Sequence, residues 1–203
     1  MKKLINTILC AAAFAASCAS ATTLSTTLRV DNSYTIYLST SDTALGASFG
    51  TLNNYNAVKS WTTDLVAGQD YYVHILATDT GGIAGVLGQF SLNGTDFTFA
   101  NGSQSLLTNT TNWTASTAGF GQTTGTPTAA TAADISSSWG STSLIDKNAQ
   151  WIWAGNNQTV NTAYLSTKIT AVKAPAAVPE PGSLALLGLG LAGVAAMTRR
   201  RRG

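Results

Sequence analysis

The fold is decided by residues 22–38, which read TTLSTTLRVDNSYTIYL. Apolar side chains recur at alternate positions in both halves of this stretch; these are Leu24, Leu28, Val30, Tyr34, Ile36 and Leu38. A period of two residues is typical of a strand that buries one face. The triplet Asp31-Asn32-Ser33 between the halves consists of residues that favour turns. The stretch therefore predicts two half-buried strands joined by a turn.

The same alternation recurs further along the chain. It predicts strands at residues 71–78, 85–92, 96–100, 151–153 and 163–171. Asn93-Gly94 predicts a short hairpin, because both residues tolerate a positive φ, and Ala67-Gly68-Gln69 predicts another turn. Residues 123–133 lack periodicity and predict a long surface loop. Many short strands with polar turns predict an all-β fold, an antiparallel β-sandwich of the jelly-roll-like kind.

Composition supports an extracellular β-sheet protein. Residues 22–178 contain 29 Thr, 16 Ser and 12 Asn, together with five basic residues, eight aspartates and no glutamate. Threonine is β-branched and suits a pleated sheet, while hydroxyl side chains keep an exposed sheet face wettable. No basic stripe is present to neutralise phosphates, so we expect no nucleic-acid binding.

Residues 1–21 are typical of a secretory signal peptide. Lys2 and Lys3 give the charged start, residues 4–16 are largely apolar, and Ala19-Ser20-Ala21 supplies small residues for cleavage before residue 22. A short membrane anchor and a lipoprotein signal remain as alternatives.

Both cysteines of the chain, Cys10 and Cys18, lie inside this predicted signal. The domain predicted at residues 22–173 therefore contains no disulfide, although its destination is oxidising. Its stability is expected to come from packing alone.

A second targeting signal is predicted near the C-terminus. Residues 174–182 form a linker that includes Val178, Pro179, Glu180 and Pro181, residues 183–198 are apolar, and residues 199–203 include Arg199, Arg200, Arg201 and Arg202. A helix of about 16 residues is about 24 Å long, which makes a short membrane span. The arginines resist translocation and keep the tip cytoplasmic. We predict a short transmembrane helix at 183–198.

This order of elements resembles the PEP-CTERM sorting signal, a Pro-Glu-Pro motif followed by a hydrophobic helix and a basic tip. In that family the partner is exosortase, an integral-membrane, transpeptidase-like enzyme that recognises and processes the signal. The resemblance implies export, a transient stay in the inner membrane, and delivery to the cell surface or extracellular matrix. An ordinary C-terminal membrane anchor is the alternative.

A second resemblance covers residues 31–92. The segments DNSYTIYL at 31–38, LVAG at 65–68 and ATDTGGIAG at 77–85, with Trp61 between them, resemble galactose-binding-like jelly-roll domains. The resemblance implies a jelly-roll ectodomain. Residues 39–42, Ser-Thr-Ser-Asp, depart from the Asn-Gly usual in that family's second hairpin.

Aromatic rings and nearby polar side chains are the groups that bind sugars. Trp61 is expected in a loop-rich stretch between two strands, and with Asp31 and Tyr37 it forms a candidate sugar-binding set. Core packing is the alternative role for Trp61.

Catalytic and cofactor sites are poorly supported. His74 is the only histidine and lies on the same side of its strand as Tyr72 and Leu76, which predicts a packed or surface side chain. With one histidine and no cysteine or glutamate in the domain, we expect no enzyme activity, no metal and no cofactor. The sequence predicts a structural or adhesive protein of an exopolysaccharide matrix; a lectin-like module or, less favoured, a glycan hydrolase acting through two aspartates is the alternative.

Overall fold

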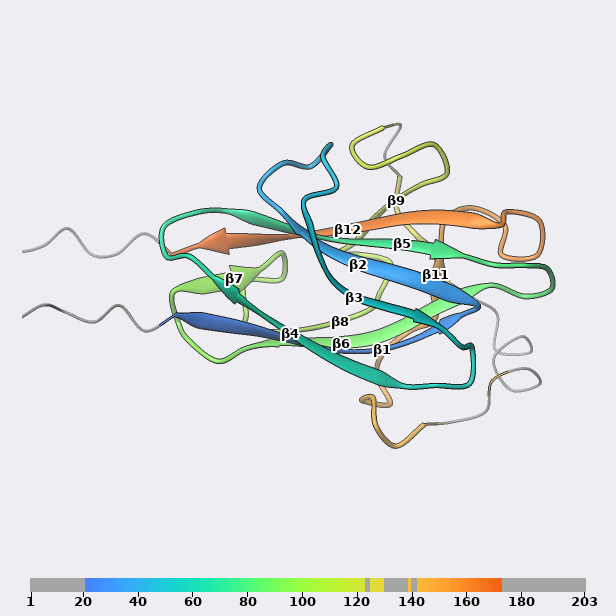
Figure 1. The fold of residues 1–203 in the computed structure, drawn as a ribbon, viewed down its shortest axis with the longest axis horizontal. Helices are drawn as coiled ribbons and strands as arrows, with labels where there is room; N and C mark the ends of the chain where they lie inside the picture. Colours follow the sequence, from blue (N-terminus) through green and yellow to red (C-terminus); the bar gives the residue numbers. More distant parts are fainter. Residues whose placement is uncertain (1–20, 123–124, 130–138, 140–141, 173–203) are drawn as a thin grey trace, which may run out of the picture.

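The structure is a computed structural model that describes residues 21–122, 125–129, 139 and 142–172. These residues form twelve strands in two sheets (Figure 1). None of them belongs to a helix long and apolar enough to span a membrane. Residues 1–20 of the predicted signal peptide, the whole of the predicted linker, the predicted helix at 183–198 and the basic tip lie outside the described residues.

Sheet A contains six strands. Their order is β10 (Thr128–Ala129), β11 (Ile152–Trp153), β6 (Gly85–Leu92), β1 (Thr22–Asp31) and β4 (Lys59–Leu65), with β8 (Ser105–Leu107) also paired to β6. Every pairing in this sheet is antiparallel.

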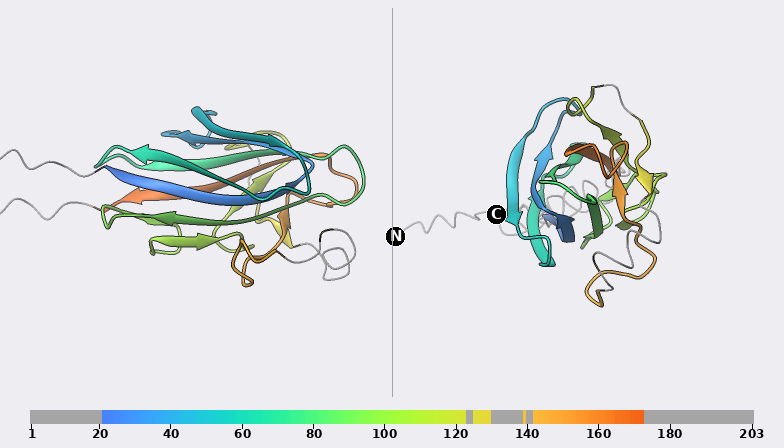
Figure 2. Two further views of the ribbon diagram at one scale, coloured as in Figure 1. Left: turned by 60° about the horizontal axis from the view of Figure 1, so that its bottom comes forward. Right: turned by 90° about the vertical axis from the view of Figure 1, so that its right-hand side faces the viewer.

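Sheet B also contains six strands. Their order is β3 (Ala47–Asn53), β2 (Ser33–Ser39), β5 (Tyr71–Thr78), β12 (Thr162–Ala171) and β7 (Phe97–Phe99), with β9 (Thr114–Ser116) also paired to β12. These pairings are antiparallel as well. The two sheets stack as layers (Figure 2), which confirms the predicted all-β antiparallel sandwich.

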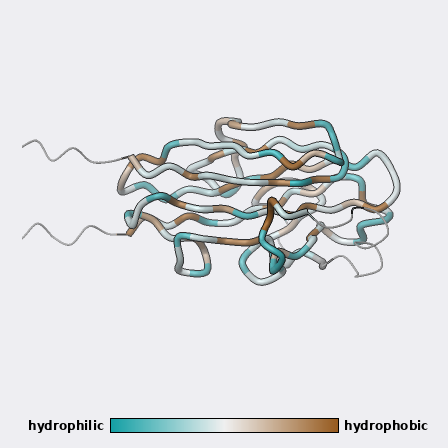
Figure 3. Tube along the Cα trace, turned by 90° about the horizontal axis from the view of Figure 1, so that it is seen from below, coloured by the Kyte–Doolittle hydropathy of each residue, from teal (hydrophilic) through white to brown (hydrophobic). Residues whose placement is uncertain are grey.

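The core lies between the inward faces of the two sheets. Fully buried residues come from both sheets; they include Leu24, Leu28, Val30, Ile36, Val73, Ile75, Leu165 and Ile169. Hydrophobic and hydrophilic residues alternate along the strands (Figure 3), as expected for strands that bury one face. The predicted inward faces of β1, β2 and β12 are therefore confirmed.

The turn at residues 31–33 joins strands of different sheets. The backbone N–H of Asn32 donates to the carbonyl oxygen of Thr78 at 3.0 Å. The side-chain oxygen of Asn32 accepts from the backbone N–H and the hydroxyl of Thr80, at 2.6 and 2.8 Å. This corner fixes the passage from β1 in sheet A to β2 in sheet B against the end of β5.

The prediction of a hairpin at Asn93-Gly94 is wrong. β6 lies in sheet A and β7 in sheet B, and neither Asn93 nor Gly94 has a positive φ. Asn93 instead pairs with Thr23 of β1: its N–H donates to the Thr23 carbonyl at 3.2 Å, and its side-chain oxygen accepts from the Thr23 N–H at 2.7 Å. This pairing extends the β1–β6 ladder and leaves the chain free to cross to sheet B, where Phe97 is buried.

Apart from β10, four strands were not predicted from the sequence: the short strands β8 and β9 and the longer strands β3 and β4. Strands β3 and β4 both occupy a sheet edge, and much of each is exposed. Their sequences, ASFGTLN and KSWTTDL, therefore lack the alternation of a half-buried strand. The short β10 falls within the loop predicted at 123–133. Only two of its residues pair with β11, which is too few to show a pattern in the sequence.

The start of β1 and the end of β12 lie at the same end of the sandwich (Figure 1). The segment at residues 93–96 contacts both: Asn93 pairs with Thr23, and the carbonyl oxygen of Asp96 accepts from the N–H of Val172 at 2.7 Å. The chain therefore enters and leaves the described domain at one end.

Candidate functional site

Trp61 lies on β4 and is half-buried against the core, so the prediction that places it in a loop is wrong. Its indole Nε1–H donates to the hydroxyl of Tyr34 at 2.9 Å. The ring lies against Gly50 of β3, where a Cβ would come within 2.5 Å of Trp61 Cδ2. The ammonium of Lys59 lies 5.6 Å from the ring centroid. The indole thus packs the edge strand of sheet A against the edge of sheet B.

Asp31 lies at the end of β1 and anchors another tryptophan. One carboxylate oxygen accepts from Trp139 Nε1–H at 2.7 Å, and the Trp139 ring stacks on Trp151 with centroids 4.1 Å apart. Burial, reinforced by the charge of Asp79, raises the pKa of the Asp31 carboxyl. In the described part of the chain, no three His, Cys, Asp or Glu side chains are placed to hold a metal ion.

Tyr37 lies on β2, opposite His74 of β5. Trp61 pairs with Thr26 of β1, five positions before Asp31, so at about 3.4 Å per residue it lies about 17 Å along the strand from Asp31. Tyr34, which bonds Trp61, faces the core, and Tyr37 occupies the opposite face. The structure does not bring Trp61, Asp31 and Tyr37 together in one site.

His74 is fully buried on the outer side of sheet B. Its Nε2 lies 3.1 Å from the carbonyl oxygen of Ser41, so Nε2 carries the proton and Nδ1 accepts from the hydroxyl of Ser166 at 2.7 Å. The ring stacks on Phe120 with centroids 4.2 Å apart. Burial lowers the pKa of His74. The prediction of a packed histidine is confirmed.

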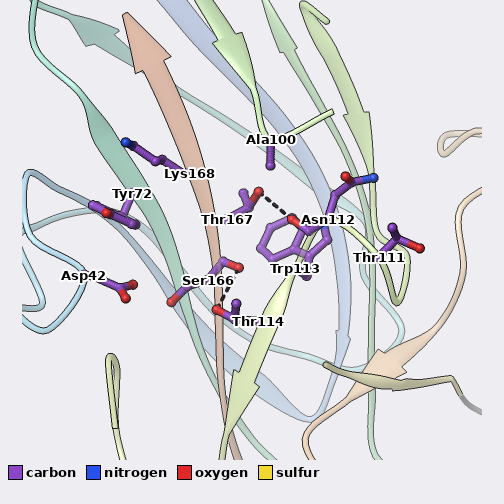
Figure 4. A pocket seen from close by; sticks show the side chains of 10 residues that line it. All are labelled: Asp42, Tyr72, Ala100, Thr111, Asn112, Trp113, Thr114, Ser166, Thr167 and Lys168. Atoms are coloured by element: carbon purple, nitrogen blue, oxygen red, sulfur yellow. Dashed lines mark hydrogen bonds between the residues drawn. The ribbon is translucent and has the colours of Figure 1, made fainter. Parts of the chain in front are cut away.

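A cavity of about 270 Å³ opens beside this histidine. Its lining comes from five separate segments of the chain: Asp42, Tyr72, Ala100, the run from Thr111 to Thr114, and the run from Ser166 to Lys168. Asp42 and Tyr72 stand on one side, Thr111 and Asn112 on the other (Figure 4). No sequence pattern joins these segments, and none of their side chains was predicted as a site.

The sorting signal was identified independently of this domain. Residues 177–202 match the family model described as the PEP-CTERM protein-sorting motif. The chain carries a PEP-CTERM sorting motif. The match includes the predicted Pro-Glu-Pro element and the arginines at 199–202, which confirms the resemblance found in the sequence. A PEP-CTERM motif implies export, sorting at the membrane and processing by exosortase. No curated protein and no solved structure matches the chain.

The contact between Gly50 and Trp61 predicts that substitutions at the two positions are energetically coupled. Gly50→Ala places a methyl group against the indole and should lower the free energy of unfolding by about 1–3 kcal/mol. In a Trp61→Ala background the same change should cost much less, because the ring is gone. Denaturant unfolding of the four proteins in a double-mutant cycle measures the difference.

Gly125→Ala is the matched control for this cycle, since a Cβ there would meet nothing closer than 3.9 Å. Equal costs of Gly50→Ala in both backgrounds would contradict the packing described for Trp61.

His74 predicts a dependence of stability on pH. Because burial lowers its pKa in the fold from the ordinary 6.5, the unfolded chain takes up the proton first as the pH falls. The contribution of neutral His74 is therefore complete above about pH 6.5 and is lost progressively below it. Thermal unfolding from pH 7.5 to 5 should show wild type losing more stability than His74→Gln. Parallel pH profiles would show that His74 titrates as it does in the unfolded chain.

Proposed function

We propose that this protein is a non-catalytic structural or adhesive component of an extracellular polysaccharide matrix, delivered there by exosortase-dependent sorting. The observation that carries the proposal is the PEP-CTERM motif at residues 177–202. The sandwich domain supports the matrix role because hydroxyl side chains occupy outward positions of its strands, such as Thr23, Ser25 and Thr27 on β1.

The order of segments along the chain supports a route of export followed by sorting at the inner membrane. The signal at residues 1–21 directs export, the apolar segment at 183–198 holds the chain in the inner membrane, and the arginines keep the tip inside. The eight residues from Val172 to Pro179 span at most about 29 Å. Exosortase therefore acts within that distance of the end of β12.

Two features of the domain are compatible with folding and remaining unaggregated outside the cell. The described strands contain no cysteine, so folding after export requires no oxidant. The edge strand β3 is interrupted by a register shift opposite Ile36 and Tyr37, and the edge strand β4 begins with Lys59. Bulges and edge lysines discourage edge-to-edge pairing between copies of a sheet protein. They therefore limit aggregation of the domain during export.

The sorting step is tested by replacing Pro179, Glu180 and Pro181 with alanine. The variant should remain in the membrane fraction, while wild type reaches the cell surface or the medium, because exosortase no longer recognises the linker. Cell fractionation followed by immunoblotting of the domain measures the distribution.

Pro175→Ala is the matched control, since it changes a proline of the same linker that lies outside the matched residues. Delivery of the triple variant at the wild-type level would refute the proposal, as would retention of the Pro175→Ala control.

A further inference from the structure

We infer that the cavity on the outer side of sheet B binds one uncharged sugar ring of a polysaccharide. The inference rests on the proposed matrix function and names the class of ligand that would hold the protein in the matrix. It uses residues other than Trp61, Asp31 and Tyr37.

The size of the cavity suits a single ring. Its volume of about 270 Å³ lies just below the range of about 300–1,000 Å³ that is typical of small-molecule pockets. Its walls project from different elements, with Tyr72 on β5, Lys168 on β12 and Asn112 just before β9. Figure 4 shows these side chains around the opening. A ligand there would be held from several sides while its chain continued outward.

The inner part of the cavity is already hydrogen-bonded. Ser166 donates its hydroxyl to His74 at 2.7 Å, and the hydroxyl of Thr167 donates to the carbonyl oxygen of Asn112 at 2.8 Å. The hydroxyl of Thr114 donates to the carbonyl oxygen of Ser166 at 3.3 Å. These groups form a fixed floor and support the residues above them.

Two polar side chains at the rim are available to a ligand. Among the described residues, none donates a hydrogen bond to the Asp42 carboxylate or bonds the Asn112 side-chain amide. A carboxylate accepts several hydrogen bonds, and an amide both donates and accepts. The two side chains stand on opposite sides of the cavity (Figure 4). Together they match the hydroxyl groups around a sugar ring.

Tyr72 supplies an apolar surface for the same ring. It is half-buried, and its ring lies nearly parallel to that of His74, with centroids 6.0 Å apart and an angle of 17°. His74 is itself held by Ser166, Ser41 and Phe120. A tyrosine backed by a fixed side chain loses little entropy on binding, and its ring packs on the C–H groups of a sugar.

Charge selects an uncharged sugar. The ammonium of Lys168 is paired with Asp70 at 2.7 Å, and this pair leaves the charge of Asp42 uncompensated at the rim. A uronic acid would bring its carboxylate towards Asp42, and like charges repel. Neutral hexoses carry no such penalty.

The test is affinity electrophoresis of the full chain, purified in mild detergent, through gels containing galactan, mannan or dextran. At least one of these neutral polymers should retard wild type, and polygalacturonate should not. Asp42→Ala and Asn112→Ala should each weaken binding at least about tenfold, because each removes a hydrogen bond to the ligand.

Asp96→Ala and Asn56→Ala are the matched controls, since both side chains are exposed and lie outside the cavity lining. Thermal unfolding midpoints close to wild type establish that every variant is folded, and two independent cavity variants guard against failure of one. No retardation by any neutral polymer, unchanged binding in both cavity variants, or stronger retardation by polygalacturonate would overturn the inference. The assay uses purified protein, so such a result leaves the sorting proposal standing.

Discussion

The structure depends on the packing of two sheet faces against each other with no covalent support. Both cysteines of the chain lie within residues 1–21, and the core consists of aliphatic and aromatic side chains from both layers. The burial of apolar surface, which contributes about 25 cal/mol per Å², is then the main source of stability. The corner at Asn32 and the contacts of residues 93–96 matter because they let the chain pass between the layers while both layers stay packed.

The outer faces carry features that the core does not require. On sheet A, Asp31 and Trp139 hold a second apolar cluster that includes Trp151. On sheet B, His74 is buried through its bonds to Ser166 and Ser41, and this arrangement fixes one side of the cavity. Buried polar groups that are fully hydrogen-bonded favour a single arrangement of the loops around them. The polar contacts on the outer faces therefore fix the loops, while the core supplies most of the stability.

Sequence reasoning succeeded where burial imposes a pattern and failed where it does not. The bounds of β5 and β6 agree with those predicted, because both strands are largely buried and pair with neighbours on both sides. The edge strands β3 and β4 have no such pattern, and Asn93-Gly94 follows its pairing with β1 rather than its turn preference. The sorting motif is local and linear, so it was recognisable. The cavity joins distant segments, and only the fold brings Asp42 close to Asn112.

Export of this packed, disulfide-free domain is expected to be followed by its separation from the sorting signal. Intact-mass spectrometry of the protein recovered from outside the cell measures this separation. We expect a chain that begins at Thr22 and ends near Pro179, Glu180 and Pro181, without residues 183–203. An extracellular chain that retains those residues, or a full-length protein confined to the cytosol, would contradict this expectation.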